Sequence, residues 1–440
     1  MGKGSAGQGE GKPPKGGGDP ARMSAAEAAE AIRAGRLTSE ALVGACLDRI
    51  AAQEERVGAW AFLDPGLALE QARGADRALR EGRPPGPLHG IPVGIKDVFD
   101  TKDMPTEYGT VLHAGRRPPE DAAAVAQLRE AGAIILGKTV TTELAVYSPG
   151  KTRNPHDPER TPGGSSSGSA AAVAAFMVPL AIGTQTNGSV IRPASFCGVC
   201  GYKPGFGLIS RHGVLRQSPP LDQVGVFART VGDAALLAEA LMSFDSRDPA
   251  MRPGARPALA GRPAGDAPAP LRLAFVKTPV WDRADADTRE AFAGLVRRLG
   301  EHVEEVALPG MFDDAVAVHR TIMEADLAAS YAGEYARGRE LLSPVLREMI
   351  ERGQRVEAAE YDRALARVPA LARALDEVSG RFDAIVTPAV PGEAPVGLES
   401  TGSPIFCTIW TLCGAPAITL PLLKGSHGMP IGVQLVGAAG

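Results

Sequence analysis

Two short segments rich in serine, threonine and glycine stand close together in the chain and carry the residue types that nucleophilic catalysis needs. The first, GGSSSGS, covers residues 163–169, and the second, TQTNGS, covers residues 184–189. A hydroxyl group becomes a nucleophile when a base removes its proton, and glycines allow a substrate to approach the backbone closely. Residues 161–198 therefore indicate an active site built from two loops.

The residues between these loops predict how the loops are brought together. Residues 169–178 are small and apolar, which predicts a helix of about ten residues, roughly 15 Å long. Residues 179–183 predict a buried strand of similar length, so the chain goes out and returns. One serine cluster would then lie beside the other at the edge of a sheet. The alternatives are a flexible linker, which would not run into an apolar helix, and a phosphate-binding nest, which does not account for the second loop.

This stretch resembles the signature region of the amidase signature family of serine hydrolases. The family pattern is GGSSGGS, about ten small or apolar residues, a G-[ST]-x-T-G-G-S segment and an Arg-Pro pair, and the resemblance extends over nearly the whole chain from about residue 24. It implies that Ser189 is the acylated nucleophile, Ser165 a serine in a cis peptide, and Lys96, in HGIPVGIKDVFD, the terminal base. The oxyanion hole would be formed by the backbone amides of Thr186, Asn187, Gly188 and Ser189.

Lys96 stands at the end of residues 88–96, an apolar segment that predicts a strand. On spacing alone, an exposed lysine beside a strand end is the favoured interpretation, and the resemblance favours a buried one instead. Burial would destabilise the ammonium form and leave the neutral amine that a base must be. The seven histidines are scattered through unrelated segments, and none is expected to serve as the base: His89, His113, His156, His212, His302, His319 and His427.

The chain departs from the common family pattern Asp-Thr-Gly-Gly-Ser at two positions. Gln185 removes a charge behind the nucleophile, and Asn187 puts a side chain where glycine normally lets the substrate carbonyl come close. Arg192, three residues after Ser189, resembles the arrangement in malonamidase and related small-amide hydrolases. Two roles stay open for Arg192: a clamp that binds a substrate carboxylate, or a structural residue bonded to backbone carbonyls.

An apolar substrate pocket is expected from four large side chains near the signature stretch and near the C-terminal end. They would suit aryl or alkyl amides and carbamates, and they are Phe196, Phe406, Ile409 and Trp410. Residues 285–299 and 313–377 are helical by period and are expected to cover one face and wall the acyl or leaving-group pocket.

Three further motifs match known patterns without their structural context. GAIILGKT (132–139) fits the phosphate-loop pattern, but its four intervening residues read as a strand. GSSSG (164–168) fits the nucleophile elbow centred on Ser166, but the residues before it read as coil. Cys197 and Cys200 form an isolated CxxC pair, which we interpret as small buried residues and not as a zinc or redox site.

Composition sets the outer bounds of the prediction. The chain has 440 residues, 44% of them hydrophobic, and a formal charge of −4, which indicates a soluble globular protein and favours neither nucleic acid nor a membrane as partner. Five cysteines in so long a chain favour a reducing compartment, so we expect a cytoplasmic protein. Residues 1–22 predict a flexible Gly/Lys/Pro-rich tail and residues 23–440 a single domain.

Helices are expected at 24–33 and 39–53, each with a serine at its cap, and an exposed connection at 246–270. A closing helix after the last strand is usual in the family, so a truncated C-terminus is also expected.

The predicted fold is a single α/β domain with a mixed, twisted central sheet covered by helices on both faces, as the family fold is. The predicted function is the hydrolysis of small amides or carbamates through an acyl-enzyme on Ser189, with no metal and no organic cofactor, by a protein that could form a homodimer. One alternative is an amidotransferase A-type subunit that passes ammonia to a partner protein. Another is an inactive binding module on the same scaffold, which the filled catalytic positions disfavour.

Overall fold

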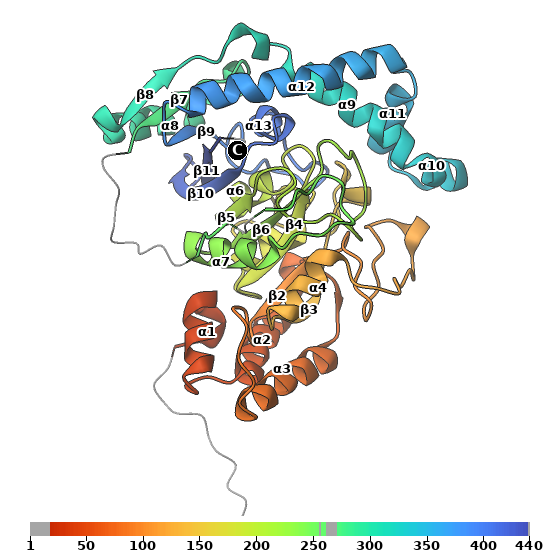
Figure 1. Cartoon of the computed structure of the whole chain (residues 1–440), viewed down its shortest axis with the longest axis vertical. Coiled ribbons are helices and arrows are strands. Elements are labelled where there is room, and N and C mark those ends of the chain that lie inside the picture. The colour runs from red at the N-terminus through yellow and green to blue at the C-terminus, as the bar shows by residue number, and fades with distance from the viewer. Residues whose placement is uncertain (1–17, 255–256, 261–270, 439–440) are drawn as a thin grey trace, which may run out of the picture.

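A mixed β-sheet extends through the molecule and carries helices on both sides (Figure 1). The computed structural model describes residues 18–254, 257–260 and 271–438, and within them the strands form one 11-stranded sheet in the order β1-β3-β2-β4-β6-β5-β10-β11-β9-β7-β8. The strands are β1 (Trp60–Leu63), β2 (Pro92–Lys96), β3 (Ile134–Thr139), β4 (Leu180–Gln185), β5 (Cys200–Lys203), β6 (Gln223–Ala228), β7 (Leu273–Val276), β8 (Val303–Val306), β9 (Ala384–Pro388), β10 (Ala417–Lys424) and β11 (Pro430–Val436). The predicted α/β fold with a mixed sheet is confirmed.

The helices are distributed over the sheet and along one end of the molecule. They are α1 (Ala25–Arg33), α2 (Ser39–Val57), α3 (Pro65–Arg80), α4 (Ala123–Glu130), α5 (Ser167–Ala174), α6 (Ile191–Cys197), α7 (Val231–Leu241), α8 (Ala286–Leu299), α9 (Ala315–Ser330), α10 (Ala332–Gly338), α11 (Pro344–Gly353), α12 (Ala358–Ser379) and α13 (Thr408–Leu412). In Figure 1, α9 to α12 form the helical layer at the top and α1 to α3 lie at the opposite end. None of the helices in the described ranges has both the length and the apolarity needed to cross a bilayer.

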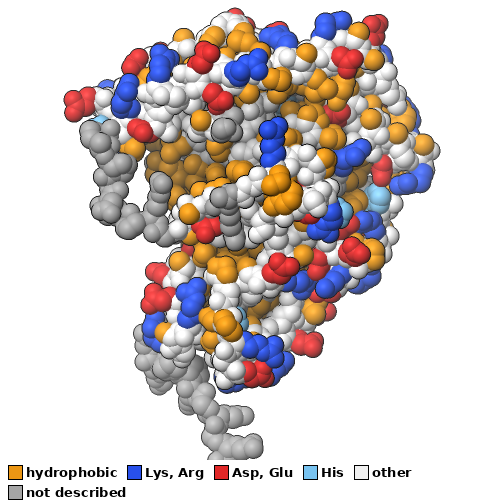
Figure 2. Space-filling model, viewed as in Figure 1, with side chains coloured by type: hydrophobic (Ala, Val, Ile, Leu, Met, Phe, Trp, Pro, Cys, Tyr) orange, Lys and Arg blue, Asp and Glu red, His pale blue; other side chains and the backbone are white. Residues whose placement is uncertain are grey.

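Two neighbouring residues of β5 show that both faces of the sheet are covered. A side chain at Gly201 would meet Ala194 of α6, whereas the thiol of Cys200 is within electrostatic reach of Asp233 on α7. Because successive side chains of a strand point to opposite faces, α6 and α7 lie on opposite faces. On the face of the molecule shown in Figure 2, basic and acidic side chains are intermixed, with no large patch of one charge.

The parallel centre of the sheet holds the two serine-rich loops together. β2 pairs in parallel with both β3 and β4, so Lys96 at the end of β2 lies at the same sheet edge as the end of β4. α5 connects the first loop to β4 and packs unusually close to the sheet. A Cβ atom on Gly168 would lie 2.3 Å from Val140 N and from Ala59 O, so only glycine fits there. The predicted helix and returning strand are confirmed, although α5 begins two residues and ends four residues earlier than predicted, and β4 begins one residue and ends two residues later.

The N-terminal region departs from two of the expectations. Pro20–Arg22 forms a 3₁₀-helix capped by Asp19, and Ala21 is buried, so these residues are folded and do not belong to the predicted tail, while residues 1–17 lie outside the described ranges. Ser24 caps α1 through a reciprocal capping box with Glu27, as predicted. The N-cap of α2, however, is Thr38, because its hydroxyl and not that of Ser39 accepts the amide of Ala41.

The motifs without structural context fold as their surroundings predict. β3 runs through the GKT of residues 132–139, so this stretch is a strand and not a phosphate loop. No strand precedes Ser166 within residues 150–165, which contradicts a nucleophile elbow. The predicted connection at 246–270 lies partly outside the described residues. Its first part is anchored, because Asp248 is buried and accepts hydrogen bonds from the Arg211 guanidinium.

Candidate active site

The amine of Lys96 is fully buried at the end of β2 and lies between two hydroxyl groups. Its Nζ atom is 2.7 Å from Ser165 Oγ and 2.8 Å from Thr184 Oγ1. Burial lowers the pKa of Lys96 well below its ordinary value, the negative charge of Asp222 partly opposes this shift, and the Arg192 guanidinium adds to it. The site thus favours the neutral amine, the form that can accept a proton.

The two serine-rich loops lie side by side, as their sequence pattern predicts. The peptide bond between Gly164 and Ser165 is cis, and the next amide, Ser166 N, donates to the carbonyl of Ser189 over 3.4 Å. Ser165 and Ser189 are both buried, with exposed fractions of 1% and 8%. Ser166 points elsewhere, since its hydroxyl donates to the carbonyl of Thr184 (3.2 Å).

The loop between β4 and α6 presents a row of unused backbone donors. Within the residues that the structure describes, no hydrogen bond is donated by the backbone N–H groups of Thr186, Asn187, Gly188 or Ser189. Gly188 has room for no side chain, because a Cβ atom there would lie 2.8 Å from Pro404. Free N–H groups beside a buried serine are the arrangement that stabilises an oxyanion.

The two departures from the family pattern take part in a polar network behind this loop. The side-chain oxygen Oε1 of Gln185 accepts hydrogen bonds from the backbone amides of Val190 (2.8 Å) and Ile191 (3.0 Å), and so caps the start of α6. The side-chain nitrogen Nε2 of Gln185 donates to Thr411 Oγ1 (2.9 Å). The Asn187 side chain donates to the Tyr147 hydroxyl (3.1 Å) and accepts from Thr408 Oγ1 (2.8 Å). A neutral amide serves at position 185 because the cap needs an acceptor and Thr411 needs a donor.

Arg192 is fully buried and makes hydrogen bonds only to backbone carbonyls among the described residues. Its Nε and one terminal nitrogen donate to Gly164 O (3.1 and 2.6 Å), and the other terminal nitrogen donates to Gly402 O (2.9 Å). Burial lowers the pKa of the guanidinium, and the ring of Tyr147 lies 5.7 Å from its central carbon. This placement favours the structural one of the two roles that the sequence leaves open.

The four large side chains expected to wall a substrate pocket are all buried. Ile409 and Trp410 pack in the main hydrophobic core, and Phe406 is 1% exposed. None of these three lines the cavity beside Thr184 and Thr186 or the one beside Pro391 and Ser403, whereas Phe196 lines the second of these. The short helix α13 is buried on all sides: its apolar side chains pack into the core, whereas Thr408 and Thr411 donate hydrogen bonds to Asn187.

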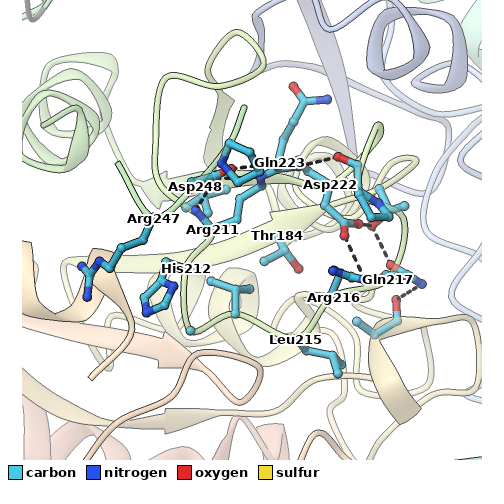
Figure 3. A pocket seen from close by; sticks show the side chains of 17 residues that line it. Thr184, Arg211, His212, Leu215, Arg216, Gln217, Asp222, Gln223, Arg247 and Asp248 are labelled. Atoms are coloured by element: carbon cyan, nitrogen blue, oxygen red, sulfur yellow. Dashed lines mark hydrogen bonds and ion pairs between the residues drawn. The ribbon is translucent and has the colours of Figure 1, made fainter. Parts of the chain in front are cut away.

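A cavity of about 260 Å³ reaches the polar side of this site (Figure 3). Thr184 and Thr186 form part of its lining, and Figure 3 shows Thr184 between His212 and Arg247 on one side and Arg216 and Gln217 on the other. Thr184 connects the cavity with the buried amine, since its hydroxyl also contacts Lys96. The lining mixes arginine, aspartate and glutamine side chains with apolar ones such as Val214 and Leu215, and it contains none of the aromatic side chains expected to wall the pocket.

Three residues at the site have no local sequence signal that would have identified them. His319 Nε2 contacts the Thr186 carbonyl (2.9 Å), Thr411 Oγ1 donates to the Asn187 carbonyl (2.6 Å), and Asp222 Oδ1 accepts from Thr186 Oγ1 (2.6 Å). Burial lowers the pKa of His319 to about 4 and raises that of Asp222 to about 6. His319 is therefore neutral near pH 7, and its Nε2 must carry the proton that the carbonyl accepts.

The sequence matches a family model and curated relatives over most of its length. The model of the family described as Amidase matches residues 41–440. Among curated proteins, the glutamyl-tRNA(Gln) amidotransferase A-type subunit of Chloroflexus aggregans is 36% identical over 448 residues, covering 92% of this chain and 91% of the relative.

Two solved structures extend the likeness to the fold. The peptide amidase of Stenotrophomonas maltophilia has a TM-score of 0.80 and 32% identity, covering 95% of this chain and 93% of its own. A chain from a vestigial protein complex, described as revealing the evolutionary origins of an s-triazine catabolic enzyme, has a TM-score of 0.87 and 28% identity, covering 94% and 95%. Both span almost the full length of the chain.

Proposed function

This chain belongs to the amidase family, and we propose that it cleaves the carbon–nitrogen bond of an amide through an acyl-enzyme on Ser189. The observation that carries the proposal is the buried amine of Lys96, 2.7 Å from the Ser165 hydroxyl, next to a loop whose N–H groups are free. Serine is a weak nucleophile until a base within reach takes its proton, and the neutral form of Lys96 supplies such a base.

The proton relay follows the order of these groups. Ser189 Oγ attacks the carbonyl carbon and forms a carbon–oxygen bond, its proton passes to Ser165 Oγ, and the Ser165 proton passes to Lys96 Nζ. The carbonyl oxygen of the substrate becomes an oxyanion and accepts hydrogen bonds from the N–H groups of the loop at 186–189. Each such donor often lowers the free energy of the transition state by about 3 to 4 kcal/mol. The relay then returns one proton to the leaving nitrogen, and the carbon–nitrogen bond breaks. Water attacks the resulting ester, which frees the acid and restores Ser189.

This reaction could be carried out by a subunit of an amidotransferase or by a free hydrolase, and the comparisons support each of the two. The curated relatives favour an A-type amidotransferase subunit, in which the ammonia released from the amide passes to a partner protein. The likeness to a peptide amidase supports a free hydrolase acting on small amides or carbamates. Both settings share the acyl-enzyme on Ser189, so the proposed chemistry is the same up to the fate of the nitrogen.

A substrate screen on the purified chain tests the proposal and separates the settings. We expect cleavage of at least one compound among glutamine, primary amides, anilides, half-amides and carbamates, with complete loss in Ser189→Ala at an unchanged melting temperature. Activity restricted to glutamine would support the amidotransferase setting, and broad activity on small amides a free hydrolase. Cleavage by Ser189→Ala at the wild-type rate would contradict the proposal.

A further inference from the structure

Three consecutive carbonyl groups of the nucleophile loop are each held from behind by a different helix. His319 Nε2 of α9 donates to Thr186 O (2.9 Å), and Thr411 Oγ1 of α13 donates to Asn187 O (2.6 Å). The third carbonyl, Gly188 O, accepts the backbone amide of Arg192 (2.9 Å), which lies in the first turn of α6.

Because the peptide bond is planar, a hydrogen bond that holds a carbonyl group also sets the direction of the N–H group in the same peptide unit. In a trans peptide the C=O of one residue and the N–H of the next point in opposite directions. Gly164–Ser165 is the one cis bond in the described ranges, so the bonds of this loop are trans. Fixing each of the carbonyls of residues 186, 187 and 188 therefore also fixes the N–H group of the following residue, which points away from the helix that holds the carbonyl.

We infer that His319 and Thr411 are positioning residues that build the oxyanion hole from behind. Within the described residues, neither side chain makes a hydrogen bond to Ser189 or Lys96. Their hydrogen bonds hold the carbonyls of residues 186 and 187, so that the N–H groups of Asn187 and Gly188 are aligned before the substrate arrives. This inference rests on the proposed acyl transfer at Ser189 and adds two residues that neither belong to the relay nor stand near it in the sequence.

The burial and chemistry of the two side chains fit this role. Thr411 is fully buried, and its hydroxyl has both functions in use, since it accepts Gln185 Nε2 (2.9 Å) and donates to Asn187 O. Gln185 in turn caps the helix that starts after Ser189, so Thr411 ties the loop to that cap. His319 is 1% exposed on α9 and has few conformations open to it.

The test compares Thr411→Val, which removes the hydroxyl at constant shape, with Thr408→Val on the same helix. Thr408 is also buried and donates to the Asn187 side chain, so its loss removes a comparable hydrogen bond and leaves the Asn187 carbonyl held. The probe is a fluorophosphonate. Ser189 Oγ bonds to its phosphorus, the phosphorus–fluorine bond breaks, fluoride leaves, and the phosphoryl oxygen occupies the oxyanion hole. Phosphonylation of Ser189 is followed by mass spectrometry, with the melting temperature as the control for folding.

We expect Thr411→Val to slow phosphonylation by about 10- to 100-fold, less than the loss of a whole donor, with Thr408→Val and Thr411→Ser within about threefold of wild type. His319→Phe should slow it similarly, and His319→Gln, which keeps a donor, should recover most of the rate. On a cleaved amide the loss should fall on kcat and not on KM. Should Thr411→Val not fold, the His319 pair decides.

The inference would be overturned if the folded Thr411→Val and His319→Phe proteins were phosphonylated at the wild-type rate. It would also be overturned if Thr408→Val lost as much of the phosphonylation rate as Thr411→Val. A wild-type protein that neither labels at Ser189 nor cleaves any amide would instead overturn the proposed function, so the two failures are distinguishable.

Discussion

The guanidinium of Arg192 clasps the carbonyl oxygen of Gly164 with two of its nitrogens, at 3.1 and 2.6 Å, and reaches Gly402 with the third. The loop that carries Ser165 is thereby tied to the helix that follows Ser189. Because all three nitrogens are engaged in this way, binding a substrate carboxylate would require the side chain to give up one of these bonds.

Replacement of Arg192 by glutamine should therefore damage the fold and the activity together. Hydrogen bonds from a charged donor are worth about 1.5 to 3 kcal/mol each, so we expect Arg192→Gln to lose about 2 to 4 kcal/mol of unfolding free energy. Turnover should fall equally on neutral amides and on amides that carry a carboxylate. Calorimetry and kinetics on one substrate of each kind check this. A selective loss on the carboxylate substrate at an unchanged melting temperature would show a clamp instead.

The pH dependence of turnover should follow the protonation of Lys96. Burial lowers the pKa of this amine, so the neutral base is present above the lowered pKa and is lost as the pH falls through it. The rate should therefore decline on the acid side, and Lys96→Ala should lose about 10²- to 10⁴-fold, the usual contribution of a general base. Lys96→Arg should not recover activity, because a guanidinium stays protonated. If Lys96→Ala kept most of its activity on an amide, a group other than Lys96 would have to accept the proton.

Labelling should discriminate between the neighbouring serines. The Ser166 hydroxyl donates a hydrogen bond to the Thr184 carbonyl, and the Lys96 amine contacts Ser165 instead. A fluorophosphonate should therefore modify Ser189 and spare Ser166. Peptide mapping of the labelled protein gives the answer directly. Ser166→Ala should keep the label on Ser189, and a label found on Ser166 in the wild type would contradict the assignment of the nucleophile.

The cysteines should be unreactive in the folded protein. All five thiols are free and buried, and burial raises the pKa of Cys200 to about 11 and of Cys46, Cys407 and Cys413 to about 12. A thiol-exchange reagent at pH 8 should therefore titrate almost none of them before denaturation and all five afterwards. Rapid labelling of the Cys197–Cys200 pair in the native protein would reopen a redox role for the CxxC motif.

The salt bridge between Asp248 and Arg211 should add an acid-sensitive increment of stability. Burial alone would raise the pKa of Asp248, but hydrogen bonds from Arg211 and from the amide of Ala250 outweigh it and lower the pKa to about 2. Because the folded pKa lies below the ordinary 3.8, the increment is present above about pH 4 and is lost as the pH falls toward 2. Asp248→Asn should cost about 1 to 3 kcal/mol at pH 7 and almost nothing at pH 2, as measured by denaturant titration. An equal cost at both values would contradict this linkage.

Features with a local signal could be predicted from the sequence. The capping box at Ser24, the strand through residues 134–139 and the helix after Ser167 all follow from neighbours within a few positions. The strand β8, with the sequence VEEV, could not be predicted because it is only four residues long and half of them are charged. The large C-terminal side chains near Trp410 were expected in a pocket and lie in the core, since hydrophobicity alone does not distinguish a pocket wall from an interior.

The polar contacts behind the nucleophile loop carry no local signal at all. His319 reaches Thr186 from 133 positions away, and Thr411 reaches Asn187 from 224. A single histidine on a helix, or a threonine in a short buried helix, looks the same in the sequence whether or not it holds a distant carbonyl. Only the folded structure, in which α9 and α13 pack against each other beside the loop that follows β4, reveals these pairs.

The order of strands in the sheet has a consequence for how activity is acquired during folding. Lys96 meets Ser165 and Thr184 across 69 and 88 positions, and the loop behind Ser189 needs helices still farther along the chain. Contacts between distant segments are slow to form, because the intervening chain must be ordered first. Secondary structure should therefore return early in refolding and enzymatic activity late, which makes turnover a reporter of complete assembly. For the same reason, a fragment that ends before α13 should be inactive even where its remaining helices and strands are formed.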